Sequence, residues 1–139
     1  MSRRVVVTGV GLVSPLAVGA EETWAALREG RSGIARVQSF DVSCFATQIA
    51  GEVKGFEPSV YIEKKEIKKM GRFIQFAVAA SECALSSSGF KVRKGEEERT
   101  GVCIGSGIGG FDVIEREHKT YLDHGPRRIS PFSTEPRQP

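Results

Sequence analysis

The densest group of charged side chains lies in the run EKKEIKKMGR, from Glu63 to Arg72. Its basic members are Lys64, Lys65, Lys68, Lys69 and Arg72. If the segment is helical, Lys64, Lys68 and Arg72 recur every fourth residue beside Lys65 and Lys69, and together they form a cationic ridge. A solvated helix face is the usual meaning of such a charge run. Like charges at this spacing repel, however, by roughly 0.2–0.5 kcal/mol each. The ridge therefore predicts an acidic partner that offsets this repulsion.

A second basic pair, Arg127 and Arg128, lies near the other end of the sequence. No aromatic residue is interleaved among the cations of the ridge, whereas sites for single-stranded nucleic acid stack bases on aromatic rings. The 20 Lys and Arg residues exceed the 17 Asp and Glu residues by only +3. Bulk charge therefore gives no reason to expect a polyanion-binding protein, and a nucleic-acid partner is not expected.

The segment Gly105–Gly110 (GSGIGG) matches the GxGxxG pattern, in which backbone amides hold a pyrophosphate between a strand and a helix. The pattern also needs an acidic residue at the end of a second strand, about 20 residues later. Glu117 and Asp123 lie instead on the predicted helix or at its end. The glycines equally allow a strand to turn sharply against a neighbouring backbone. A nucleotide-binding α/β domain thus stays as an alternative.

The thiols and imidazoles show no catalytic or metal-binding arrangement. Cys44, Cys83 and Cys103 form no CxxC pair, and neither His118 nor His124 stands at ligand spacing from them. We therefore expect no metal site and no cofactor. Cys103 is predicted to be an inert core residue in the middle of a strand, and His118 a core histidine on the apolar face of a helix. An odd number of thiols favours a reducing compartment, so the predicted location is cytoplasmic.

The elements that must position these residues alternate between strand and helix. The expected order is a strand at Val5–Val7, a helix of about ten residues between Glu21 and Gly30, a strand region at Phe45–Val53, a helical stretch at Val60–Phe90, a strand at Thr100–Gly105 and a helix that ends near Gly125. The 139 residues, 40% hydrophobic, are enough for one core. No run approaches the roughly 20 apolar residues of a membrane span. The pattern indicates an α/β class with a parallel, layered sheet.

Four motifs together resemble the start of the β-ketoacyl-acyl-carrier-protein synthases of the type II class. They are VVVTGVGLVSP at 5–15, the segment 65–76, GVCIGSGIGG at 101–110 and GPRRISPF at 125–132. The similarity covers roughly residues 2–132, in the family's order. It implies a thiolase-like fold, an α-β-α-β-α layered sandwich, of which this chain is an incomplete N-terminal portion. The implied domain is a truncated synthase domain at 1–132, followed by an aberrant or frayed tail at 133–139.

The resemblance also implies a reaction. Such enzymes act as homodimers in fatty-acid biosynthesis, load an acyl chain onto a cysteine and condense it with malonyl carrier protein, releasing carbon dioxide. A thiolate at a helix N-terminus, two histidines and backbone amides perform this chemistry. In the family all these groups follow the SPF segment, Ser130–Phe132. No catalytic residue therefore carries over, and the chain alone is expected to be an inactive N-terminal fragment.

Some binding residues do match family positions. Those implied to contact acyl carrier protein are Lys65, Lys68, Lys69, Arg127 and Arg128. Those implied to line the acyl pocket are Ile108 and Phe132. A different class of function remains open beside the synthase fragment, namely a non-catalytic module that only binds acyl carrier protein.

The sequence departs from the family pattern at three places. Gly71 stands where the family commonly has Asp, and a glycine inside a helix loosens it by about 1 kcal/mol. Ser133 replaces an aromatic residue, and 134–139 loses the pattern where an apolar helix is expected. We interpret the abrupt change as a frameshift, an early stop or a gene-model error. Translating the adjacent DNA in all frames should then recover a continuation that contains a cysteine.

Overall fold

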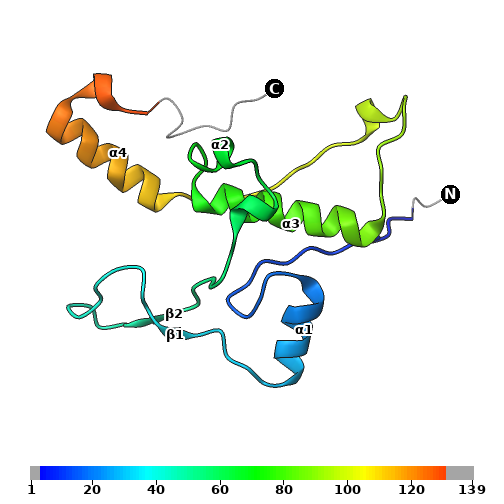
Figure 1. Cartoon of the computed structure of the whole chain (residues 1–139), viewed down its shortest axis with the longest axis horizontal. Coiled ribbons are helices and arrows are strands. Elements are labelled where there is room, and N and C mark those ends of the chain that lie inside the picture. Colours follow the sequence, from blue (N-terminus) through cyan, green and yellow to red (C-terminus); the bar gives the residue numbers. More distant parts are fainter. Residues whose placement is uncertain (1–3, 131–139) are drawn as a thin grey trace. The chain divides into compact units, whose positions relative to one another are not determined.

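The computed structural model describes residues 4–130, and most of its regular structure is helical (Figure 1). The α-helices of this part are α1 (Ala20–Arg28), α2 (Lys64–Ile67), α3 (Arg72–Ser88) and α4 (Phe111–His124). The strands are β1 (Ala35–Arg36) and β2 (Ile49–Ala50), and the 3-10 helices are η1 (Pro58–Val60), η2 (Glu97–Arg99) and η3 (Pro126–Arg128). The chain divides into two compact units, one of Met1–Glu57 with Ala79–Lys91 and one of Pro58–Val78 with Val92–Pro139.

In the first unit, helix α1 forms where the sequence predicts it. Glu21 and Glu22 in its first turn and Arg28 in its last turn complement the helix dipole. The Gly30 amide donates to the Leu27 carbonyl at 3.0 Å, and Gly30 has a φ of +68°, a conformation that favours glycine. The predicted helix of about ten residues that stops at Gly30 is confirmed.

The N-terminal segment crosses the last turns of α3 at two glycines. A Cβ atom at Gly9 would lie 2.7 Å from the Ser88 Cβ, and one at Gly11 would lie 2.7 Å from the Ala84 backbone nitrogen. No side chain fits at such distances, so only glycine permits this approach. Close packing against a neighbouring backbone is therefore what the first glycine-rich motif does.

The strands differ from the sequence-based prediction. Residues 4–130 contain one ladder, the antiparallel pair of β1 and β2 with Ala35 opposite Ala50, and one isolated bridge between Val13 and Val18. The parallel strands predicted at Val5–Val7 and Thr100–Gly105 are therefore wrong for the described chain. A strand requires a neighbour that completes its backbone hydrogen bonds, and an apolar run predicts burial without specifying that neighbour.

A carboxylate extends the hairpin beyond its short ladder. Glu52 accepts hydrogen bonds from the backbone amides of Gln38 at 2.9 Å and Ser39 at 3.1 Å. Hydrogen bonding by the Ser39 side chain, and then by the Gln38 amide, lowers the pKa of Glu52 below its ordinary 4.5. The ionised carboxylate therefore joins the two arms of the hairpin at neutral pH.

In the second unit, the helical stretch predicted at Val60–Phe90 is interrupted between α2 and α3. The Gly71 carbonyl accepts from the amides of Ile74 and Gln75 at 3.0 and 3.2 Å, so Gly71 caps the start of α3. The Gln75 side-chain amide donates to the carbonyls of Ile67 and Met70 at 3.2 and 3.0 Å. Because Gly71 lies at a cap, the cost expected for a glycine inside a helix does not apply to it.

The core of the described chain is small. Its buried apolar side chains are Ala26, Val42, Ile62, Ala79 and Val113. Val102 and Ile104 are exposed, and so is Cys103 between them, which makes the prediction of a buried core cysteine wrong. His118 is likewise exposed and not a core histidine. Both predictions assumed apolar neighbours that the described residues do not supply.

Candidate functional site

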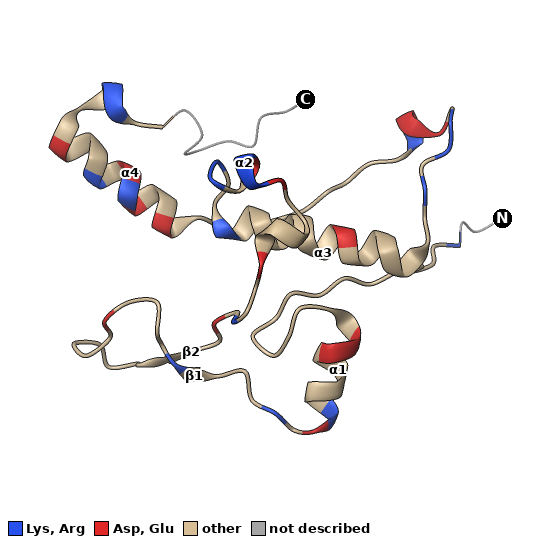
Figure 2. Ribbon diagram, in the orientation of Figure 1, with Lys and Arg blue, Asp and Glu red and all other residues tan. Residues whose placement is uncertain are grey.

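The first candidate surface is the group of Lys64, Lys65, Lys68, Lys69 and Arg72, which we call the α2 basic cluster. It does not lie on one helix: Lys64 and Lys65 belong to α2, Lys68 and Lys69 follow its end at Ile67, and Arg72 begins α3 (Figure 2). The predicted helical ridge is therefore wrong in its geometry. All members of the cluster are nevertheless exposed. A turn between two helices presents these cations instead of a single helix face.

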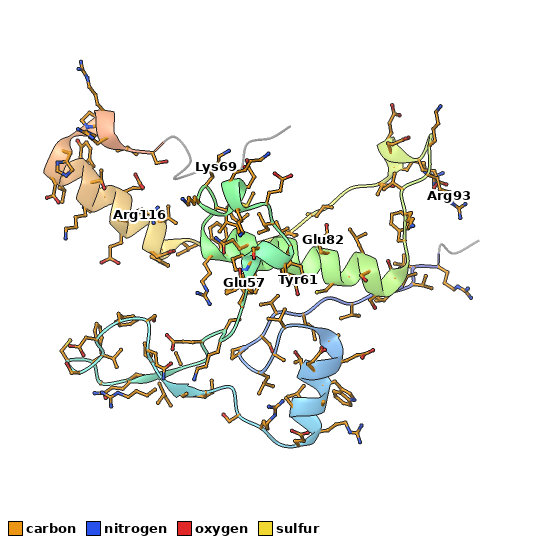
Figure 3. All side chains as sticks on the ribbon, viewed as in Figure 1. Glu57, Tyr61, Lys69, Glu82, Arg93 and Arg116 are labelled. Carbon is orange, nitrogen blue, oxygen red and sulfur yellow. The ribbon has the colours of Figure 1, made fainter. Side chains whose placement is uncertain are left out.

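Local acids divide the cluster into paired and unpaired cations. The Lys65 Nζ lies 2.7 Å from a carboxylate oxygen of Glu63, and the Lys69 Nζ, labelled in Figure 3, lies 2.8 Å from one of Glu66. Lys64 and Lys68 form no ion pair with any residue of the described chain, 4–130. Exposed ion pairs contribute only about 0–1 kcal/mol each, so a partner can compete for the paired lysines.

The Glu66 carboxylate stays charged beside the cluster. The hydrogen bond from Lys69 lowers the pKa of Glu66 below its ordinary 4.5, and the nearby charges of Lys69 and Lys65 act in the same direction. At neutral pH the carboxylate therefore neutralises part of the positive charge that the cluster offers.

The guanidinium of Arg72 is partly engaged within its own helix. Its carbon Cζ lies 5.2 Å from the centre of the Phe76 ring, which is a cation-π distance. Stacking restricts the orientation of the guanidinium while leaving its charge exposed. Arg72 therefore forms the ordered edge of the α2 basic cluster.

The turn that carries Ile108 rests on an aromatic ring from α3. A Cβ at Gly109 or Gly110 would lie 2.8 Å from the Phe73 ring, and these two glycines have φ angles of +61° and +51°. Ile108 itself is 67% exposed. Its role in an acyl pocket stays a prediction, and Phe132, the other predicted pocket residue, lies outside the described residues. No strand leads directly into this turn in the part of the chain that the structure describes, so the GxGxxG pattern lacks the strand that nucleotide binding requires.

The second basic group, Arg127 and Arg128, lies in η3 directly after α4, and both side chains are exposed. Helix α4 has 14 residues, which corresponds to a rise of about 21 Å. The α2 basic cluster ends beside the start of α4, where a Cβ at Gly71 would lie 3.3 Å from Val113, whereas η3 follows its end (Figure 2). The structure therefore does not merge the two basic groups into one patch.

Two residues were not among the sequence-predicted contacts. Lys64 is exposed and forms no ion pair within residues 4–130. Its position in the charged run Glu63–Arg72 is the sequence feature that could have identified it as a contact. Glu117 accepts a hydrogen bond at 2.9 Å from the amide of Ser130, thirteen positions later. The sequence pattern offers Glu117 only as a candidate acid for nucleotide binding, because no local spacing indicates a contact of this range.

The described residues, 4–130, contain no group of three or more His, Cys, Asp or Glu side chains placed to hold a metal ion. Across the same residues, no helix combines the length and apolar character that crossing a membrane requires.

Comparisons with known proteins identify what this arrangement is similar to. The family model described as "Beta-ketoacyl synthase, N-terminal domain" matches residues 2–138. The 3-oxoacyl-[acyl-carrier-protein] synthase 2 of Vibrio harveyi is 48% identical over 130 residues, which cover 94% of this chain and 31% of the relative. The enzyme of the same name from Coxiella burnetii is 45% identical with the same coverage. The chain thus spans about a third of the length of the curated relatives it matches.

Solved ketosynthase structures also align with the chain. The ishigamide ketosynthase/chain length factor matches with a TM-score of 0.75 and 34% identity, covering 94% of this chain and 33% of that one. A β-ketoacyl synthase from Burkholderia phymatum STM815 matches with a TM-score of 0.74 and 33% identity, covering 95% and 33%. A type II PKS ketosynthase solved with its acyl-carrier protein, AntDE:AntF, matches with a TM-score of 0.72 at 24% identity, over 96% of this chain and 32% of that one, and supports the fold alone.

Proposed function

Because the chain belongs to the β-ketoacyl synthase family through its N-terminal domain, we propose that it forms the N-terminal part of a 3-oxoacyl-[acyl-carrier-protein] synthase of fatty-acid biosynthesis. The identity to enzymes of that name and the thiolase-like ketosynthases among the structural neighbours support this assignment. The proposed reaction of the whole enzyme is the condensation of an acyl group with malonyl carrier protein, with loss of carbon dioxide.

The part of this reaction that we assign to the present residues is docking of the carrier protein. The condensation itself needs an activated cysteine and groups that stabilise an oxyanion. The family resemblance implies that these groups follow Ser130–Phe132, so we propose that the 139 residues do not catalyse condensation alone. Their proposed contribution is the cationic surface to which the acyl carrier protein brings its substrate.

The α2 basic cluster is the observation that carries this proposal. All its cations are exposed, and Lys64 and Lys68 have no acidic partner in residues 4–130. Complementary charge steers association and makes it fast, weak and sensitive to salt. The ketosynthase AntDE, which has a similar fold, was solved in complex with an acyl-carrier protein, AntF. We propose an interaction of the same kind here, with the α2 basic cluster and Arg127–Arg128 as two separate contacts.

Binding to acyl carrier protein at low salt tests the proposal. Reversing the charge at Lys65, Lys68 and Lys69 with glutamate should weaken binding about tenfold or more, because three favourable interactions become repulsive. The matched control reverses the same number of charges at Lys91, Arg93 and Lys94, exposed residues before η2, and should change binding less than threefold at roughly equal net charge. Equal binding by the two triple variants contradicts the role of the α2 basic cluster.

A further inference from the structure

The segment Gly125–Ser130 folds back along α4 instead of leaving it. Gly125 ends the helix with a φ of +78°, and its amide donates to the Tyr121 carbonyl at 2.9 Å. Pro126 then begins η3, where its fixed φ suits a first helical position. The Ser130 amide finally returns to the helix and donates to the Glu117 side chain at 2.9 Å. The segment is therefore a closed loop whose two ends are both attached to α4.

The Glu117 side chain is well placed to hold this loop. It is 14% exposed, whereas the side chain of its neighbour Arg116 is 64% exposed. One carboxylate oxygen accepts from Ser130, and the other lies 3.4 Å from the Arg116 Nε. The turn bonds inside the loop, from Arg128 to Gly125 and from Ile129 to Pro126, measure 3.3 and 3.4 Å. They are long beside the 2.9 Å bond to a charged acceptor, and bonds to ionised groups are the stronger kind.

The loop presents the exposed pair Arg127 and Arg128, which form no ion pair with residues 4–130. Immobilising long side chains on binding reduces affinity, so a loop ordered beforehand binds more tightly than a mobile one. We propose that Glu117 is a positioning residue that fastens Gly125–Ser130 to α4 and thereby fixes the arginine pair for an acidic partner. The identity of that partner, acyl carrier protein, rests on the proposed function.

Whether replacing Glu117 weakens or strengthens the binding of the acidic partner distinguishes a positioning role from a purely electrostatic one. Glu117 is negative, so removing its charge alone should strengthen the binding of an acidic partner. Loss of positioning should weaken that binding. Glu115 provides a matched control, because it is an exposed acid on the same helix whose side chain makes no hydrogen bond or ion pair with the described residues. Only Glu117 combines the charge with the tie to Ser130.

The experiment measures binding of acyl carrier protein to variants of the intact protein that carries these residues. Glu117→Ala should weaken binding about two- to tenfold, while Glu115→Ala should leave it unchanged or strengthen it. Glu117→Gln keeps an oxygen that accepts from the Ser130 amide and should bind within about twofold of the parent protein. In a background of Arg127→Gln and Arg128→Gln, Glu117→Ala should have no further effect, because coupled residues are not additive.

Two results overturn the proposal. The first is equal binding by Glu117→Ala and Glu115→Ala. The second is an equal loss of binding from Glu117→Ala in the parent protein and in the Arg127→Gln, Arg128→Gln background, because that result indicates general destabilisation. Hydrogen exchange at the Ser130 amide gives a readout independent of the partner. It should accelerate in Glu117→Ala and not in Glu115→Ala, and an unchanged rate also overturns the proposal. If acyl carrier protein does not bind the parent protein at all while Ser130 exchange still responds to Glu117→Ala, the proposed docking function fails, and the attachment of the loop by Glu117 is still supported.

Discussion

Glu66 determines how much of the positive charge of Lys69 is available to a partner. Its carboxylate lies 2.8 Å from the Lys69 Nζ. Removing the carboxylate charge ends the neutralisation of Lys69 by Glu66, so Glu66→Gln should tighten the binding of acyl carrier protein about twofold or more at low salt. The control Glu82→Gln removes the same charge from an exposed position, labelled in Figure 3, that makes no ion pair with the described residues. An equal gain in both variants indicates net charge as the cause.

The pH dependence of the Glu66–Lys69 pair follows from the direction in which the pKa of Glu66 is shifted. The pKa of Glu66 is lowered in the folded chain, so its pairing with Lys69 is fully present above the ordinary value of 4.5 and is lost as pH falls through the lower folded value. An NMR titration of the Glu66 carboxyl should therefore give a midpoint below 4.5, and Lys69→Ala should raise it. A midpoint that does not respond to Lys69→Ala contradicts the pairing.

At the scale of single residues, sequence spacing predicts some side-chain contacts and does not predict others. The Glu66–Lys69 pair joins neighbours three positions apart, a contact that helical spacing predicts. The tie from Glu117 to Ser130 depends instead on how the chain turns at Gly125. The turn brings Glu117 and Ser130 together only in the folded chain, so no local sequence pattern predicts the hydrogen bond between them.

At the scale of elements, helix ends were predictable and strand pairing was not. Gly30, Gly89 and Gly125 follow helices with φ angles of +68°, +63° and +78°, and glycine at these positions is a local signal. The break before α3 was missed because Gly71 caps that helix without a positive φ, inside an otherwise helical pattern. Strand pairing depends on a second segment far along the chain, which the apolar run alone does not identify.

The packing of Phe73 against the Gly109–Gly110 turn yields a prediction about that turn. Gly109→Ala should lower the stability of the intact protein by about 2–5 kcal/mol, because a left-handed conformation costs about 1–2 kcal/mol and overpacking about 1–3 kcal/mol. Gly55→Ala is the control, since Gly55 has a similar φ of +66° but nothing within 4 Å of a Cβ atom, and it should cost about 1–2 kcal/mol.

Chemical denaturation measures both changes, and a second substitution identifies the ring as the cause. Phe73→Ala removes the two ring atoms that a Cβ at Gly109 would meet at 2.8 Å and leaves the Ser106 Oγ, which lies at the same distance. In that background the additional cost of Gly109→Ala should fall toward the cost of Gly55→Ala, because only the backbone conformation and the contact with the Ser106 side chain remain unfavourable. Equal costs for the two glycine substitutions in the parent protein contradict the packing role of Phe73.

At the scale of the whole molecule, the family was predictable from four ordered motifs, whereas burial was not. The motifs contain glycines and charged residues that are required by their immediate surroundings, such as the close approach of Gly9 and Gly11 to α3. Burial depends on everything that surrounds a segment. Val5, Val7 and Val102 are each more than 75% exposed in the described chain, although the apolar pattern predicted buried strands. Apolar faces of this kind require covering surface, which the small core does not provide.

A chimera tests the fold assignment and the proposed function together. The 130 matched residues of this chain replace their counterparts in the Vibrio harveyi synthase, whose remaining sequence, on the proposed function, supplies the catalytic groups. The chimera should condense acyl and malonyl carrier protein, whereas residues 1–139 alone should show no condensation and should bind a hydrophobic dye through their exposed valines.

Lys65→Glu, Lys68→Glu and Lys69→Glu together should raise the KM of the chimera for carrier protein and leave its kcat nearly unchanged, because docking precedes chemistry. A folded chimera without activity contradicts the proposed function, and a loss of kcat at unchanged KM contradicts the docking role.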